Sequence, residues 1–182
     1  MTRLCGVIAG NVCHYIAKQP LLPFSLDYDG WKVWDISRDM VHSGLLRNLP
    51  CLDGVYLLDG EISPFYFGRS LHVCRRLRHH GQPWRTAICF TLGESELEEI
   101  DRQYLEFAMG LMLLLNGVVT RNKRLDYPKP NRDAAEYAIA FLNEALVPLW
   151  REHGRELGLP TRKLLASAKQ VETVLSSWVS QH

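Results

Sequence analysis

Two β-rich runs joined by an Asp-Gly pair constrain the fold of this chain more than any other feature. Residues 54–58 and 64–67 are mostly aromatic and β-branched or aliphatic, and Asp59-Gly60 follows the first run. An Asp-Gly pair between two such runs is a strong signal for a β-hairpin. A helix over about 71–80 and a third strand over 86–92 are expected next, so the predicted order is strand, strand, helix, strand.

The rest of the chain reads as mixed structure before this segment and helices after it. Residues 1–50 are interrupted by prolines and glycine and predict a packed extension with one helix over 39–49. Ser95 is placed to begin a helix whose apolar residues recur at helical spacing. Two further helices, over about 133–153 and 161–179, predict a C-terminal α-hairpin.

Composition excludes several classes of protein. The 182 residues are 47% hydrophobic and 23% charged, which is typical of a globular domain and not of a disordered chain or a fibre. The net charge of +1 means that attraction to nucleic acid would have to come from local patterning. The longest apolar run, residues 107–119, is too short for a membrane span of about 20 residues.

The cysteines indicate a reducing compartment. There are five, an odd number, and no Cys-x-x-Cys pair prepares a zinc site or a redox dithiol. We therefore expect free thiols and a cytoplasmic protein without a signal peptide. They are Cys5, Cys13, Cys51, Cys74 and Cys89.

Local positive charge is concentrated in two segments. Residues 66–90 hold no acidic residue and five arginines: Arg69, Arg75, Arg76, Arg78 and Arg85. A second segment, the loop over 121–132, begins with Arg121, Lys123 and Arg124. Both could bind phosphate. The alternatives are a solvated helix face for the first segment and a solvated linker for the second.

Helical geometry distinguishes the residues of the 71–80 segment. With roughly 100° per residue, Val73 and Leu77 define the packed face, Arg76 lies about 80° from its centre and Arg75 about 180°. Arg76 is therefore expected to point along the sheet. His80 lies about 40° from the same centre, which fits either a site residue or an ordinary core histidine.

Tyrosines and one glutamate are the remaining candidates. Strand alternation puts Tyr56 on one face of the hairpin with Tyr66 near the facing position, although tyrosine is also a common structural residue in strands. Glu106 is the only charged residue from 103 to 120. A buried carboxylate needs a cationic partner such as Arg76, a metal ion, or a proton, and a simple ion pair is the plain alternative.

Taken together, these residues resemble the GIY-YIG nuclease superfamily over about residues 52–117. The matching elements in chain order are Gly54-Val55-Tyr56, Tyr66-Phe67-Gly68-Arg69-Ser70, Arg76, His80, Glu106 and Asn116. Val55 and Phe67 replace the usual isoleucines, and neither change removes a reacting group. The resemblance implies an α+β fold with a small antiparallel three-stranded sheet flanked by helices. This core spans 51–117, between an N-terminal extension (1–50) and a basic loop and helical C-terminal region (118–182).

The resemblance also implies hydrolysis of DNA phosphodiester bonds with one divalent ion, Mg²⁺ or Mn²⁺. Glu106 would be the metal ligand, Arg76 would stabilise charge on the phosphate, and Tyr56 would take a proton from the attacking water. His80 would relay that proton, while Tyr66 would orient water or phosphate.

Asn116 would brace the site. The expected partner is therefore DNA, not a membrane, and a homodimer through the terminal helices is an open alternative. A restriction-type or defence endonuclease is the favoured interpretation. A nuclease of repair or mobile elements acting on branched DNA, a nucleic-acid-binding protein without turnover and a structural interaction domain are the alternatives.

Overall fold

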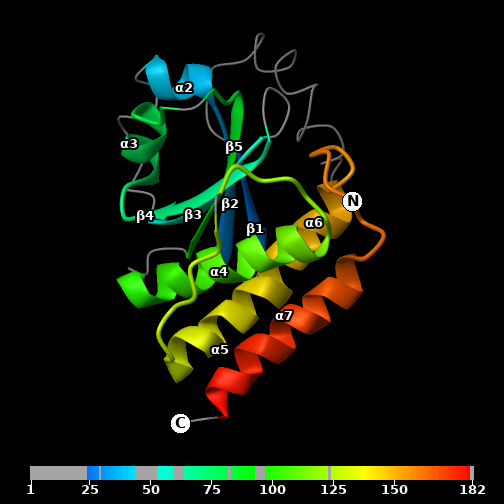
Figure 1. The fold of residues 1–182 in the computed structure, drawn as a ribbon. Helices are drawn as coiled ribbons and strands as arrows, with labels where there is room; N and C mark the ends of the chain where they lie inside the picture. Colours follow the sequence, from blue (N-terminus) through cyan, green and yellow to red (C-terminus); the bar gives the residue numbers. More distant parts are fainter. Residues whose placement is uncertain are drawn as a thin grey trace.

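A computed structural model shows an α+β fold built on one five-stranded antiparallel sheet (Figure 1). It describes residues 24–28, 30–43, 53–59, 64–81, 83–92, 97–122 and 124–180. The strand order is β1-β2-β5-β3-β4, and every pair of neighbouring strands is antiparallel. The strands are β1 (Phe24–Tyr28), β2 (Trp31–Ser37), β3 (Gly54–Leu58), β4 (Tyr66–Ser70) and β5 (Thr86–Leu92).

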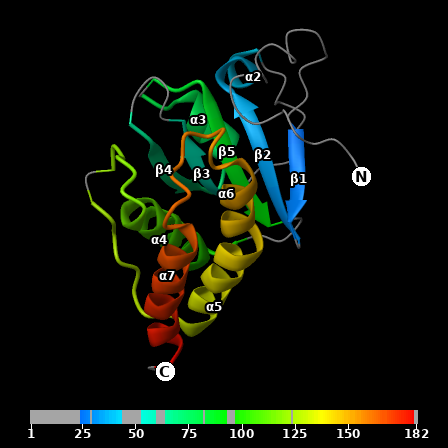
Figure 2. The ribbon, with the colours of Figure 1, turned by 90° about the vertical axis from the view of Figure 1, so that its right-hand side faces the viewer.

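Helices cover both faces of the sheet (Figure 2). The first face packs against α4 (Glu99–Leu115), α5 (Arg132–Phe141), η2 (Leu142–Leu146), α6 (Val147–His153) and α7 (Leu164–Val179). The second face packs against α2 (Arg38–His42) and α3 (Val73–Arg78).

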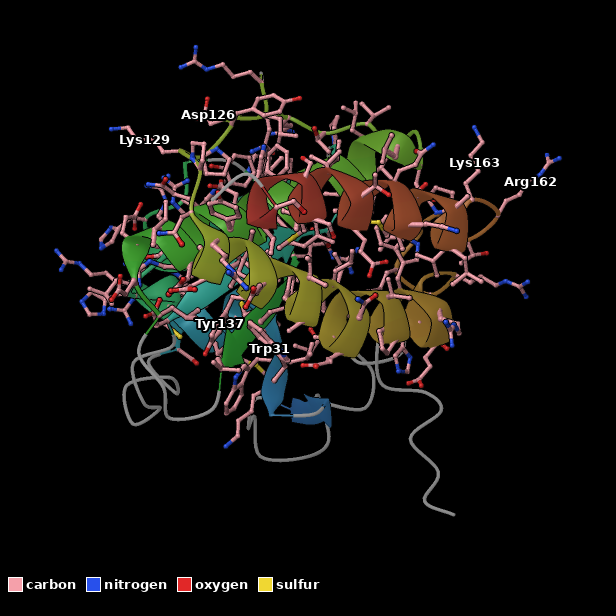
Figure 3. All side chains as sticks on the ribbon, turned by 90° about the horizontal axis from the view of Figure 1, so that it is seen from below. Trp31, Asp126, Lys129, Tyr137, Arg162 and Lys163 are labelled. Atoms are coloured by element: carbon pink, nitrogen blue, oxygen red, sulfur yellow. The ribbon has the colours of Figure 1, made fainter. Side chains whose placement is uncertain are left out.

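Alternation along the strands separates two hydrophobic cores. On β3, Val55 and Leu57 belong to the larger core with α4 to α7, whereas Tyr56 and Leu58 belong to the smaller core with α2 and α3. This is the period of two that an extended strand imposes. Trp31 contacts α5 through an edge-to-face contact with Tyr137 (Figure 3) and a tilted ring contact with Phe141.

The α+β class is confirmed, but the prediction of a three-stranded sheet is wrong. The predicted strands are present as β4-β3-β5, and β2 extends the sheet by pairing with β5 along its full length. Both additional strands come from residues 24–37, which the sequence analysis assigned to an extension. Residues 31–35 alternate between buried and half-buried, and an Asp-Gly pair, Asp29-Gly30, precedes them just as Asp59-Gly60 follows β3. The same hairpin signal was therefore present twice.

Several helix boundaries differ from the prediction. Within the described residues, the helix expected over 39–49 is α2, which ends at His42, while residues 44–50 lie outside the described part of the chain. Ser70 does not cap α3; the hydroxyl of Ser70 accepts a hydrogen bond from the His72 amide at 3.0 Å, and His72 is the N-cap. Ser95 lies outside the described residues, and α4 begins after Glu98 in a capping box with Asp101.

The C-terminal helices follow the prediction. The two predicted helices correspond to α5 through α6 and to α7, and they share the larger core with the sheet. Of the described cysteines, neither Cys74 nor Cys89 is in a disulfide, whereas Cys5, Cys13 and Cys51 lie outside the described residues, so the expectation of thiols is tested for two of the five. Among the described helices, none combines the length and the apolar character that crossing a bilayer requires.

Candidate active site at the edge of the sheet

A polar pocket of about 300 Å³ opens at the edge strand β4. It brings together side chains from two strands and two helices. The lining residues are Tyr56, Tyr66, Gly68, Arg69, Ser70, Arg76, Glu99 and Glu106. Five of the residues that the sequence singled out are therefore in one pocket: Tyr56, Tyr66, Arg69, Arg76 and Glu106.

Gly68 allows this pocket to include residues from both faces of the sheet. Tyr56 pairs in register with Gly68, and the phenol lies across the glycine. A Cβ at position 68 would sit 2.8 Å from the Tyr56 hydroxyl and 3.2 Å from a ring carbon of Tyr66. The next residue, Arg69, pairs with Val55, so its side chain points to the opposite face of the sheet from Tyr56. Because Gly68 has no side chain, no atom at that position separates Tyr56 from Arg69 at the strand edge.

On the α3 side, Arg76 meets the buried tyrosine. Its Nε donates to the Tyr56 hydroxyl at 3.4 Å. The predicted helical phase is confirmed, since Val73 and Leu77 are buried and Arg75 is exposed. Burial raises the pKa of the Tyr56 hydroxyl, and the hydrogen bond from Arg76 opposes only part of that effect. Tyr56 is therefore protonated at neutral pH.

His80 packs where the helical phase placed it. Its ring makes an edge contact with Tyr66 at a centroid distance of 4.7 Å and approaches Tyr56 at 6.4 Å. The two tyrosine rings are 6.2 Å apart. His80 is thus the inward histidine, adjacent to both phenols.

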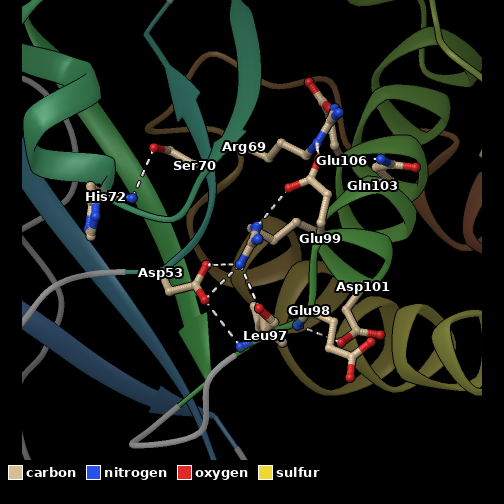
Figure 4. Close-up of polar contacts among 11 residues, drawn as sticks. Asp53, Arg69, Ser70, His72, Leu97, Glu98, Glu99, Asp101, Gln103 and Glu106 are labelled. Atoms are coloured by element: carbon tan, nitrogen blue, oxygen red, sulfur yellow. Dashed lines mark hydrogen bonds and ion pairs between the residues drawn. The ribbon is translucent and has the colours of Figure 1, made fainter.

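On the α4 side, Glu106 has a cationic partner, which is Arg69. Its carboxylate accepts from Nη1 of Arg69, the same guanidinium that donates through Nε to Glu99 at 3.0 Å (Figure 4). Arg76 was named from the sequence as an example of such a partner. It belongs to α3, which packs on the other face of the sheet beside Tyr56, while Arg69 projects toward α4.

The pKa values of Glu106 and Glu99 are shifted in opposite directions. Burial raises the pKa of Glu106, and the neighbouring Asp126 and Glu99 add to that effect while Arg69 opposes it. Burial also favours a raised pKa for Glu99, but hydrogen bonds from Arg69, Gln103 and Arg102 outweigh it and lower the pKa of that carboxyl. Glu99 is therefore firmly anionic, whereas Glu106 is held in its charged form mainly by Arg69.

Glu99 and its anchors were missed by the sequence analysis. Arg102 is buried and donates from Nη1 to both carboxylate oxygens of Asp53, at 2.9 Å each (Figure 4). Its Nε also donates to Glu99 at 3.2 Å. Glu99 lies seven residues, two turns, before Glu106 and is therefore on the same helix face, a spacing from which the sequence could have placed it in the site.

Asn116 does not join the pocket. It ends α4, is buried, and its Nδ2 donates to the Met112 carbonyl at 2.9 Å. Asn122 instead contacts the strand of the site. Its side chain accepts from the Phe67 amide at 3.1 Å and donates to the Phe67 carbonyl at 2.8 Å, so it covers the outer edge of β4.

Apart from Arg69, none of the described residues predicted to bind DNA lines the pocket. Arg75, Arg78, Arg85 and Arg124 are exposed, and Lys123 lies outside the described residues. The Arg121 amide donates to the Phe65 carbonyl at 2.7 Å, which fixes the start of the basic loop beside β4. Arg124 pairs with Asp126, and both Asp126 and Lys129 project from the loop (Figure 3).

The donor set fits a hard divalent ion with few protein ligands. Within the described residues, no three His, Cys, Asp or Glu side chains are gathered closely enough to hold a metal. Mg²⁺ requires less, because it keeps several waters and takes one or two carboxylates plus phosphate oxygens. Glu106 and Glu99 supply such carboxylates in a pocket that has room for water.

The chain matches no protein-family model, no curated protein and no solved structure. The GIY-YIG resemblance and the nuclease activity therefore remain predictions, carried by the residues of the pocket.

Proposed function

We propose that this protein is a divalent-metal-dependent DNA endonuclease of the GIY-YIG type. One observation carries the proposal. A single pocket combines a guanidinium, a buried phenol and a carboxylate, each drawn from a separate element around an edge strand. Arg76, Tyr56 and Glu106 are the residues on which the chemistry would depend.

Arg76 would bind the scissile phosphate. Its guanidinium is hydrogen-bonded to the Tyr56 hydroxyl through Nε and also to Tyr66, and its remaining N–H groups would bind non-bridging oxygens. Negative charge grows on these oxygens in the pentavalent transition state. A fixed cation at this place lowers the barrier without any reorganisation of the site.

Tyr56 would take part in proton transfer through a relay and not as a free phenolate. Because its pKa is raised by burial, its hydroxyl is protonated at neutral pH. It can accept a proton from the attacking water only as it passes its own proton on. His80, packed against both tyrosine rings, is a titratable group that can receive that proton.

Glu106 would hold the metal through a carboxylate oxygen. A divalent cation, when bound, would supply positive charge for the leaving 3′-oxygen. The half-buried position of Glu106 and its apolar helix limit the number of competing waters. Glu99, held by Arg102, adds negative charge to the same pocket.

DNA would approach over the exposed arginines of α3 and the basic loop. Arg75 and Arg78 flank Arg76 on one side, and Arg124 and Lys129 extend from the loop beside β4 on the other. Such contacts follow phosphates and carry no sequence information themselves. A restriction-type or defence role remains our preferred interpretation of a nuclease of this size.

The test is incubation of the full chain with supercoiled plasmid and with single-stranded and branched DNAs, in Mg²⁺, in Mn²⁺ and in EDTA. We expect Mg²⁺-dependent nicking or cutting. Discrete fragments would identify a sequence-specific enzyme, and a preference for branched substrates would identify a repair or mobile-element nuclease. Absence of cleavage of every substrate in both Mg²⁺ and Mn²⁺ would contradict the proposal.

A further inference from the structure

Arg69 lies between the two carboxylates of the pocket. Its Nε donates to Glu99 at 3.0 Å and its Nη1 donates to Glu106 (Figure 4). Within the described part of the chain, it is the one cation that forms a salt bridge with Glu106. The sequence analysis placed Arg69 among residues that bind DNA, yet its guanidinium is directed at carboxylates.

The hold on Arg69 is built from more than one contact. Glu99 is itself fixed by Arg102 at 3.2 Å and by Gln103 at 3.3 Å, and Arg102 is anchored on Asp53. The Arg69 side chain is 30% exposed and that of Glu106 is 20% exposed. A charge-assisted pair at this depth is screened less than a surface pair, so it is maintained at physiological ionic strength.

A metal ion and Arg69 would need the same carboxylate. A carboxylate oxygen that accepts a hydrogen bond from a guanidinium directs its lone pairs at that cation. The guanidinium then also blocks the approach of a second cation to the same oxygen. Two cations brought to one carboxylate also repel each other. Occupancy of Glu106 by Arg69 and occupancy by a divalent ion therefore oppose one another.

We propose that Arg69 is an internal counter-cation that competes with the divalent metal for Glu106. This inference rests on the proposed function, because it takes Glu106 as the metal ligand. In the free protein Arg69 occupies the carboxylate and keeps metal affinity low. When metal binds, Arg69 leaves Glu106 and its guanidinium becomes available to the phosphate of the substrate.

The formal charges of the pocket residues explain why this exchange would favour binding of metal and substrate together. The lining holds two arginines and two glutamates, so the free pocket is neutral in formal charge. In the described salt bridges, Arg69 is paired with both glutamates and Arg76 with neither. In the free pocket, Arg76 is therefore the arginine that a phosphodiester could bind without displacing a carboxylate. After exchange, both arginines and the metal face the phosphate, so each ligand raises the affinity for the other.

The experiment measures Mn²⁺ binding in the absence of DNA, by calorimetry and by the electron paramagnetic resonance signal of free Mn²⁺. Arg69→Gln removes the competing cation, and we expect Mn²⁺ to bind on the order of tenfold more tightly than to the wild type. The matched control is Arg132→Gln, which removes an exposed arginine paired with Glu136 outside the pocket. Its Mn²⁺ affinity should equal that of the wild type.

Arg69→Lys keeps the protein testable if the glutamine variant does not fold. A lysine has one ammonium group and lacks the fork that spans Glu99 and Glu106, so its Mn²⁺ affinity should lie between the wild type and Arg69→Gln. Mn²⁺ affinities of both variants equal to or below that of the wild type would overturn the proposal. A merely structural Arg69 would give that result together with a lower melting temperature.

The outcome is separable from that of the proposed function. If the wild type cleaves DNA in Mg²⁺ but neither Arg69 variant gains Mn²⁺ affinity, only the proposed counter-cation role of Arg69 is contradicted. If the wild type cleaves no DNA but Arg69→Gln binds Mn²⁺ more tightly, the competition for Glu106 is supported and the proposed nuclease activity is contradicted.

Discussion

At the scale of single residues, Arg76 and Arg75 are neighbours in sequence with different surroundings. Both side chains are exposed, but the Arg76 guanidinium also reaches the Tyr56 hydroxyl. We predict that Arg76→Ala lowers the single-turnover cleavage rate by a factor of about 10² to 10³, since it removes on the order of 3 to 4 kcal/mol of transition-state stabilisation. Thermal unfolding should be nearly unchanged because the Arg76 side chain packs little.

Arg75→Ala is the matched control. It removes the same charge from the same helix and should lower cleavage much less, through weaker DNA binding alone. Equal losses in the two variants would show that the arginines only attract DNA.

Asp35 gives a prediction about pH. This β2 residue is buried, and one of its carboxylate oxygens has no hydrogen-bond partner within the described residues. Burial, with a smaller contribution from Asp59, raises its pKa from 3.8 to about 7. The folded protein therefore keeps a proton that the unfolded chain releases, so Asp35 makes stability fall as pH rises from about 4 to 7.

Asp35→Asn should remove that dependence. We expect the variant to be more stable than the wild type at pH 8, by on the order of 4 kcal/mol at most, and close to it at pH 4. Calorimetric melting temperatures from pH 4 to 8 would measure the difference. Parallel curves for the two proteins would mean that the carboxyl is not desolvated in solution.

At the scale of elements, the edge strand β4 depends on a single side chain from the basic loop. Asn122 satisfies both the amide and the carbonyl of Phe67 on the side that no strand covers. Replacing it by alanine leaves two backbone groups unpaired, and we predict a loss of about 1 to 3 kcal/mol in the free energy of unfolding. The Phe67 amide should also exchange faster with solvent.

Asn143→Ala, at an exposed position of η2, is the control for that measurement. Urea unfolding should separate the two variants. If the two lose equal stability, the loop does not cover the strand edge.

Sequence patterns predicted some elements better than others for physical reasons. The strands β3 and β5 and the helix α4 were found because they carry long apolar or alternating runs of one period. The strands β1 and β2 were missed because residues 20–30 hold two prolines and a glycine and were taken as an interruption. Here the Gly30 turn joins two strands, and long-range pairing of β2 with β5 decides the outcome.

The same distinction applies to the site. Helical phase was sufficient to place Arg76 and His80, because it is a local property. The cation that pairs with Glu106 depends on which face of the sheet α4 covers, so the sequence could offer Arg76 only as an example of a partner. That choice is set by packing of whole helices, which leaves no mark in the spacing of residues near Glu106.

At the scale of the whole molecule, the sheet separates two cores and the pocket connects them at its edge. Tyr56 belongs to the smaller core and Glu106 projects from a helix of the larger one. Neither core alone contains the complete set of groups. The helices α5 to α7 contribute by holding α4 against the sheet, which fixes the position of Glu106 relative to β4.

The most direct test of this account is single-turnover nicking of supercoiled plasmid in Mg²⁺ by the wild type, Glu106→Gln and Glu136→Gln. Glu136 is an exposed glutamate paired with Arg132, so its substitution removes the same charge outside the pocket. We predict Mg²⁺-dependent nicking by the wild type and by Glu136→Gln, and none above background by a folded Glu106→Gln protein. Nicking by Glu106→Gln at the wild-type rate, or no nicking by the wild type, would contradict the assignment of this pocket as a metal-dependent nuclease site.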